Sequence, residues 1–155
     1  MSRRRIEERL GPCRARGAAG LKGYQLKFNK YGRDGSGKCT IQHTGDGRQH
    51  VLGGLFDLSQ AQARQLDGFE GSGYSRHMVS LNYQDQSLNA YTYIAVAQSI
   101  DDSLIPFDWY RALVLQGACE LELARSYVLK IRSLPYKVDP DPVRRGSNLQ
   151  IINRQ

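Results

Sequence analysis

The chain contains 155 residues, a length typical of a single domain with its own buried core. Hydrophobic residues make up 40% of it and charged residues 24%, as in ordinary globular proteins, and no run of about 18 apolar residues is present that could span a bilayer. No apolar stretch follows the basic N-terminus, so we expect no secretory signal.

The net charge of +7 is concentrated at one end of the chain. Residues 1–38 hold 11 Lys or Arg and three acidic residues. Such a segment can bind nucleic acid, but a solvated basic face is the more common outcome, so we expect neither nucleic acid nor a membrane as a partner. Cys13, Cys39 and Cys119 are odd in number and scattered, which favours free thiols and a cytoplasmic location.

The first part of the chain predicts a short helix followed by strands. Residues 2–10 form a helical pattern that Ser2 can cap and that Gly11 can end. Residues 13–20, rich in Arg, Ala and Gly, are expected to form a loop. Hydrophobic patterning and turn signals then predict strands over residues 24–29, 39–43 and 51–58.

The second part predicts further strands and then helices. Residues 59–62 (SQAQ) have the capping-box pattern and predict a helix to about Asp67. Strands are predicted over residues 74–82 and 88–96. A helix should open at Pro106, with a break near Gly117, and a second should follow through Ile131. Residues from 134 onward are rich in proline and predict an extended tail.

This order of elements, mostly strands and then two helices, predicts an α+β fold. We expect a mainly antiparallel small β-barrel or curved sheet with helices packed at one side. The domain should cover residues 1–134, and residues 135–155 should form the tail.

Two motifs that suggest other chemistry are incomplete. Residues 32–39 (GRDGSGKC) nearly match a phosphate-binding loop, but Cys39 stands where the magnesium-binding hydroxyl belongs, and a strand is predicted to follow instead of a helix. His43, His50 and His77 do not form a metal-ligand set. We therefore expect no nucleotide, metal or other cofactor.

Glu70 is the strongest candidate for a chemical role. It lies between a predicted helix and a glycine-rich bend, where a lone carboxylate can face a cavity. Apolar walls would raise its pKa, and Glu70 could then act as a general acid or base near neutral pH. The alternative is a carboxylate that only bonds to the backbone amides of the bend.

Several spaced segments around Glu70 resemble the γ-glutamylcyclotransferase-like (AIG2-like) family. They are residues 54–58 (GLFDL), 66–71 (LDGFEG) and 73–76 (GYSR), followed by a helical end that carries Tyr110, Gly117, Ala118, Leu123 and Tyr127. The resemblance covers about residues 1–132. Glu122 and Ala124 replace the glycine and proline that usually flank the leucine, which would let the helix run on without a break.

The resemblance implies an enzyme without a cofactor. The α-amine of a γ-glutamyl substrate would attack its own γ-carbonyl and release 5-oxoproline, with Glu70 as general acid and base. Glutathione, other γ-glutamyl amino acids and γ-glutamylamines remain open as substrates, and a homodimer is an open alternative to a monomer. The expected substrate-binding residues are Gly53, Gly54, Leu55, Tyr74, Ser75, Gly146, Ser147 and Asn148.

The N-terminus departs from the family pattern, which begins with a strand and a Tyr-Gly-Ser-Asn loop. Residues 1–11 already resemble the helix that follows that loop. Either the natural protein starts upstream, or residues 146–148 (GSN) supply the loop by folding back or by swapping into a partner, or their similarity arises by chance. Tyr74 also stands one place earlier than the family tyrosine, at whose position this chain has Ser75; on a strand, that shift changes the face.

Two other functions remain open. The chain could be a member of this fold that binds a small ligand without catalysis, which the absent loop and Ser75 favour. It could also be an interaction module that uses its basic N-terminal third, which salt-sensitive binding of nucleic acid would reveal.

Overall fold

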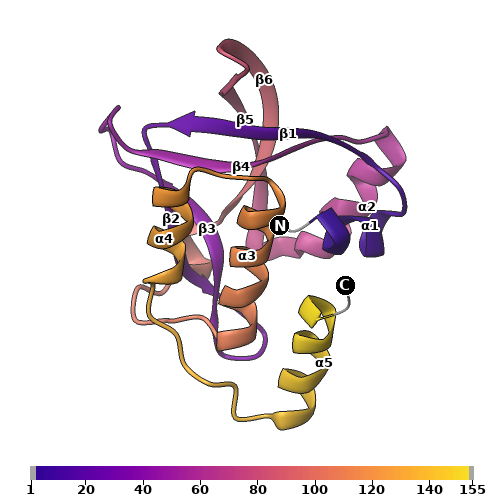
Figure 1. Cartoon of the computed structure of the whole chain (residues 1–155), viewed down its shortest axis with the longest axis vertical. Helices are drawn as coiled ribbons and strands as arrows, with labels where there is room; N and C mark the ends of the chain where they lie inside the picture. The colour runs from indigo at the N-terminus through magenta and orange to yellow at the C-terminus, as the bar shows by residue number, and fades with distance from the viewer. Residues whose placement is uncertain (1–2, 154–155) are drawn as a thin grey trace.

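The computed structural model describes residues 3–153 and shows two antiparallel sheets with helices around them (Figure 1). The larger sheet has the strand order β4-β1-β5-β6, and the smaller pairs β2 with β3. The strands are β1 (Arg14–Lys22), β2 (Tyr24–Tyr31), β3 (Gly37–His43), β4 (His50–Asp57), β5 (Tyr74–Tyr83) and β6 (Gln86–Ala95). The helices are α1 (Arg3–Leu10), α2 (Gln60–Glu70), α3 (Asp108–Glu120), α4 (Arg125–Arg132) and α5 (Pro142–Asn153).

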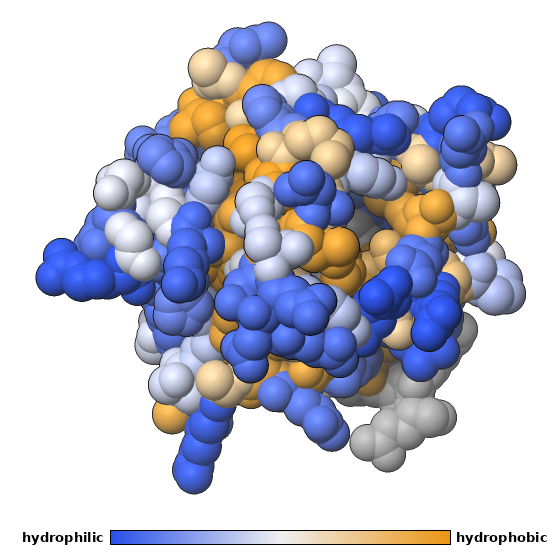
Figure 2. Space-filling view, turned by 90° about the horizontal axis from the view of Figure 1, so that it is seen from above, coloured by the Kyte–Doolittle hydropathy of each residue, from blue (hydrophilic) through white to orange (hydrophobic). Residues whose placement is uncertain are grey.

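The α+β class, the antiparallel pairing and the flanking helices are therefore confirmed. Across residues 3–153 the two sheets form separate ladders, so the closed barrel is wrong, and a curved sheet is compatible with the structure. No helix in this range combines the length and apolar character needed to cross a bilayer. Figure 2 shows the molecule from above. Hydrophobic residues lie at the centre of the face seen in that view, among mostly hydrophilic ones.

The loop predicted over residues 13–20 is wrong, because this segment belongs to β1, an inner strand of the larger sheet. β1 pairs with β4 along its length and meets β5 at Gly20 and Asn82. Its alanines and glycines give no alternation of large apolar side chains, which is why pattern reading missed it. Gly17, with φ of 125°, lies at the register shift against β4, a backbone conformation that glycine adopts readily.

Helix α2 begins as its sequence predicts and ends three residues later than expected. Ser59 accepts a hydrogen bond from the amide of Gln62, whose side chain accepts one from the amide of Ser59. The helix continues to Glu70, and Gly71, with φ of 65°, follows as its C-terminal cap. This cap places Glu70 in the last turn.

The connection between α3 and α4 shows that a helix break survives without the family's glycine and proline. Gly117 lies in the last turn of α3, so the break comes three residues later than Gly117, near where it was predicted, and the alternative of a helix that runs on is wrong. The break falls after Glu120, and Glu122 adopts a left-handed conformation with φ of 52°. The amide of Leu123 donates to the carbonyl of Ala118 across this turn.

The tail is not extended throughout, because residues 142–153 form α5. Asp141 accepts hydrogen bonds from the amides of Val143 and Arg144, and Pro142 occupies the first helical position. The helix packs Leu149, Ile151 and Ile152 against the cluster of Phe107, Trp109 and Leu113. Within the described residues the tail adds one parallel bridge, between Phe107 and Lys137, and no strand to either sheet.

Candidate active site

A cavity of about 740 Å³ lies between the two sheets and the helices α1, α2, α3 and α4. Its wall includes four of the residues predicted from the sequence, namely Gly53, Gly54, Glu70 and Tyr74. One part of the wall is apolar, formed by Leu26, Ile41, Val51, Leu52, Leu113, Val114, Leu121, Leu123 and Ile131. The other part is rich in charge.

Glu70 is held at this cavity by the packing of α1 on α2. Ile6 and Leu10 of α1 form a buried cluster with Leu66 of α2. This contact brings the guanidinium of Arg9 to 3.4 Å from a carboxylate oxygen of Glu70 and over the ring of Phe69. The side chain of Glu70 is only 15% exposed.

Burial raises the pKa of Glu70 above its ordinary value, against the lowering effect of Arg9 and, more weakly, of Lys30. The side chain therefore meets the condition set for it from the sequence, since it faces a cavity and is shielded from bulk water. A carboxylate with a raised pKa can accept and return a proton more readily near neutral pH.

Tyr74 points into the cavity, which resolves the question raised by its shifted position. Its hydroxyl donates to the carbonyl of Cys39 at 2.6 Å. Ser75, the next residue of β5, lies outside the cavity wall, and its hydroxyl is 2.8 Å from Nε2 of His77. Tyr74 thus provides the hydroxyl in the pocket, and Ser75 does not join the site.

A second tyrosine completes the contacts of the Cys39 backbone. The amide of Cys39 donates to the hydroxyl of Tyr110 at 3.1 Å. Burial raises the pKa of both Tyr74 and Tyr110, so both hydroxyls stay protonated. Burial also raises the pKa of the Cys39 thiol to about 12, so this cysteine is not a ready nucleophile.

The two glycines of β4 have different roles. A Cβ at Gly54 would lie 2.7 Å from the ring of Phe56 and 3.1 Å from Leu121, so the backbone here packs closely. A Cβ at Gly53 would meet no atom within 4 Å, so the wall is open there. Leu55 is not part of the cavity wall.

The structure does not bring Gly146, Ser147 and Asn148 to the cavity. They lie inside α5, where the hydroxyl of Ser147 donates to the carbonyl of Val143 and the side-chain amide of Asn148 to that of Arg144. Residues in a helix interior use their backbone amides within the helix, so this segment does not form the loop expected of it.

The basic residues of the cavity were missed from the sequence. They are Arg5, Arg9, Lys30, Arg33 and Lys38, and all fall in the segment expected to be a solvated face. The positive charge of residues 1–38 was visible, but its convergence depends on contacts between residues far apart in the chain. Across residues 3–153, no group of three or more His, Cys, Asp or Glu side chains is arranged to hold a metal ion.

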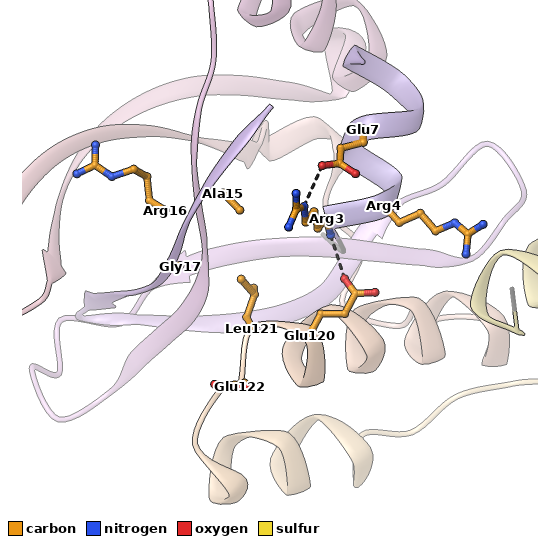
Figure 3. Close-up of a pocket in the computed structure, with 9 residues that line it drawn as sticks. All are labelled: Arg3, Arg4, Glu7, Ala15, Arg16, Gly17, Glu120, Leu121 and Glu122. Atoms are coloured by element: carbon orange, nitrogen blue, oxygen red, sulfur yellow. Dashed lines mark hydrogen bonds and ion pairs between the residues drawn. The ribbon is translucent and has the colours of Figure 1, made fainter. Parts of the chain in front are cut away.

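A second hollow, of about 440 Å³, lies between α1, β1 and the α3–α4 turn (Figure 3). Three of its charged residues, Arg3, Glu7 and Glu120, contact one another through Arg3. The side chain of Arg3 pairs with Glu7 at 2.9 Å, and the backbone amide of Arg3 donates to Glu120 at 3.1 Å. This hollow also lacks the sheltered carboxylate found at Glu70, so the larger cavity is the better candidate.

The sequence profile of the AIG2-like family matches residues 50–131, which include Glu70 and Tyr74. The chain belongs to the AIG2-like family. This match confirms the resemblance drawn from the motifs around Glu70. No curated protein matches the chain.

Solved structures share the fold of this AIG2-like chain. A structure described as a gamma-glutamyl cyclotransferase has a TM-score of 0.82 at 20% identity, over 99% of this chain and 93% of its own. The human protein loc79017, described as uncharacterized, has a TM-score of 0.78 at 22% identity, over 97% and 91%. YkqA from Bacillus subtilis has a TM-score of 0.63 at 17% identity, over 84% and 48%. At these identities the similarity establishes the fold alone.

Proposed function

We propose that this AIG2-like protein cyclises a γ-glutamyl compound and releases 5-oxoproline, with Glu70 as general acid and base. The observation that carries the proposal is the sheltered Glu70 carboxylate on the wall of a cavity large enough for a small molecule. The gamma-glutamyl cyclotransferase of the same fold supports the reaction type. We also propose a cytoplasmic location, which the free cysteines support.

The proposed reaction needs proton transfer and positioning. Glu70 takes a proton from the substrate's α-ammonium, and the freed amine attacks the γ-carbonyl carbon. A bond forms between these atoms, and the bond from that carbon to the leaving nitrogen breaks. Overall, two protons of the ammonium end on the leaving nitrogen, which departs as an ammonium, and Glu70 returns to its starting state.

The test is release of 5-oxoproline by Glu70→Gln. The amide keeps the shape of the side chain but cannot accept the proton, so we expect turnover to fall by about 100-fold or more. Glu8→Gln is the matched control, because Glu8 is exposed on α1 and outside the cavity wall. Turnover by Glu70→Gln at the wild-type rate would rule out the proposed role.

The ion pair between Arg9 and Glu70 favours a second candidate, a ligand-binding protein without catalysis. A nearby guanidinium stabilises the ionised carboxylate and reduces its ability to hold a proton. A thermal shift caused by γ-glutamyl compounds, with no product formed, would support this candidate over the enzyme.

A further inference from the structure

The charged part of the cavity has more cations than its own carboxylates can balance. Its wall carries five Lys or Arg side chains and two carboxylates, Asp34 and Glu70. Each of these carboxylates already has a cation beside it, since Lys38 lies 2.6 Å from Asp34 and Arg9 lies 3.4 Å from Glu70. This excess of cationic over anionic side chains on the wall favours an anionic ligand.

Lys30 is the cation best placed to receive such a ligand. It lies near the end of β2, is half-buried on the cavity wall, and its ammonium is 5.0 Å from the centre of the Tyr74 ring. Within residues 3–153, no carboxylate oxygen lies within ion-pair distance of its Nζ. A half-buried ammonium that has no carboxylate in direct ion-pair contact gains from a ligand that supplies one.

The absence of a side chain at Gly73 leaves space for the ammonium of Lys30. A Cβ on Gly73 would lie 2.8 Å from Nζ of Lys30 and 2.7 Å from its Cε. Any side chain at Gly73 would therefore displace the ammonium. Gly73 follows Glu70 by three residues, so the same bend that carries the proposed catalytic group also makes room for Lys30.

The two cations around Glu70 come from different elements. Arg9 belongs to α1 and contacts Glu70. In the proposed reaction the substrate's α-amine lies next to Glu70, so the α-carboxylate attached to the same carbon would lie near Arg9. Lys30 comes from β2 and stands over Tyr74. This arrangement offers two separate anion contacts on one ligand.

We propose that Lys30 is a specificity-determining residue that binds a carboxylate on the leaving group of the γ-glutamyl substrate. The inference rests on the proposed function. It predicts that this chain prefers γ-glutamyl compounds whose leaving amine also carries a carboxylate. γ-Glutamyl compounds whose leaving amine has no carboxylate should be poorer substrates.

Two substrates that differ in one group test this preference. γ-Glutamyl-alanine carries the second carboxylate, and γ-glutamyl-alaninamide replaces it with a neutral amide of the same shape. We expect wild-type kcat/KM to be about tenfold higher for the acid, the size typical of one charge-assisted contact. Lys30→Met should abolish this preference, mainly through a higher KM for the acid, and Lys30→Arg should restore part of it.

Lys27→Met is the matched control, because Lys27 lies on the same strand but outside the cavity wall. It should keep the wild-type preference. Equal turnover of the two substrates by the wild type would overturn the inference and leave the proposed function intact. If Lys30→Met lowers kcat/KM equally for both substrates, the inference is also overturned, because Lys30 would then not distinguish the two leaving groups.

Titration calorimetry tests the role of Lys30 even if the protein turns out not to be an enzyme, because it measures binding and not turnover. If neither substrate yields 5-oxoproline, the proposed enzyme is ruled out, and the affinities of the same two compounds decide the role of Lys30. Binding of the acid about tenfold tighter than the amide, lost in Lys30→Met, supports selection at this site. Equal affinities, or no binding of either compound, overturn it.

Discussion

At the scale of single residues, Glu70 and Tyr74 define the site. Glu70 ends α2 and Tyr74 begins β5, and the short bend between them turns both side chains into one cavity. Burial acts on both in the same direction, raising the pKa of the carboxyl and of the phenol. The bend therefore places the carboxyl of Glu70, which can exchange protons, on the same cavity as the hydroxyl of Tyr74, which stays protonated.

The raised pKa of Glu70 gives the proposed reaction a pH dependence. The carboxylate must be ionised to accept a proton from the substrate, so kcat/KM should fall as pH drops through the raised pKa of Glu70. A pH profile of kcat/KM should place this acidic limb above the ordinary glutamate value of 4.5. A limb at or below that value would contradict the role.

The same shift predicts how Glu70→Gln affects stability. A carboxyl whose pKa is raised by folding contributes stability below its unfolded pKa, and this contribution is lost as pH rises through the folded value. Ionising Glu70 in the folded state therefore costs stability, and Glu70→Gln, whose side chain cannot ionise, should keep or slightly raise Tm. A thermal scan at pH 7 checks this, and a marked fall in Tm would contradict it.

The Tyr74 hydroxyl should contribute measurably to stability. Tyr74→Phe leaves the carbonyl of Cys39 without this hydrogen bond, so we expect a loss of about 1–2 kcal/mol in the free energy of unfolding. Tyr91→Phe is the control, because within the described residues its buried hydroxyl has no hydrogen-bond partner and should cost little to remove. Urea denaturation of both variants provides the comparison; equal losses would contradict the prediction.

At the scale of elements, the α3–α4 connection shows how tertiary packing overrides a local preference. Glu122 adopts a left-handed conformation that favours glycine. Ala118, Leu123, Tyr127 and Ile131 form one buried cluster across the break. The burial of these residues holds α4 against α3 and keeps the turn in place without the residues that would favour it.

Glu122→Gly should therefore stabilise the protein by about 0.5–1 kcal/mol, since glycine removes the strain of the left-handed residue. Ala112→Gly, inside α3, should do the opposite and cost about 1 kcal/mol. Chemical denaturation measures both. A loss of stability in Glu122→Gly would show that the left-handed turn carries no strain.

At the scale of the whole molecule, one buried carboxylate ties the C-terminal segment to the rest. Asp139 accepts a hydrogen bond from the indole of Trp109 on α3 and from the guanidinium of Arg144 on α5, both at 2.7 Å. A further ion pair joins Arg145 to Asp108. These contacts fasten α5 to α3 and complete the cluster around Trp109.

This attachment should depend on pH. The guanidinium of Arg144 holds the pKa of Asp139 well below its usual range. The stability that Asp139 contributes is present above its unfolded pKa of about 3.9 and is lost as pH falls from there toward the folded value. Asp139→Asn should cost about 2 kcal/mol at pH 7 and weaken the fall of Tm between about pH 4 and pH 2. An unchanged acid dependence of Tm would contradict this assignment.

The local parts of this fold could be read from the sequence because their causes are local. The alternation at residues 24–29, the capping box at Ser59 and the glycines around Glu70 each act through neighbours in the chain. The start of α5 was also available locally, since Asp141 and Pro142 form a helix-start signal, but the prolines before them favoured an extended segment.

The sequence by itself determined the α+β class, most of the strands and the prominence of Glu70. Only the tertiary structure decided that residues 14–22, with few large apolar side chains, form an inner strand, that the hydroxyl of Tyr74 donates to the backbone carbonyl of Cys39, and that Arg9 and Lys30 lie around Glu70. The reason is distance along the chain: Arg9 and Glu70 are 61 residues apart, and no local pattern records a contact that exists only after α1 has packed on α2.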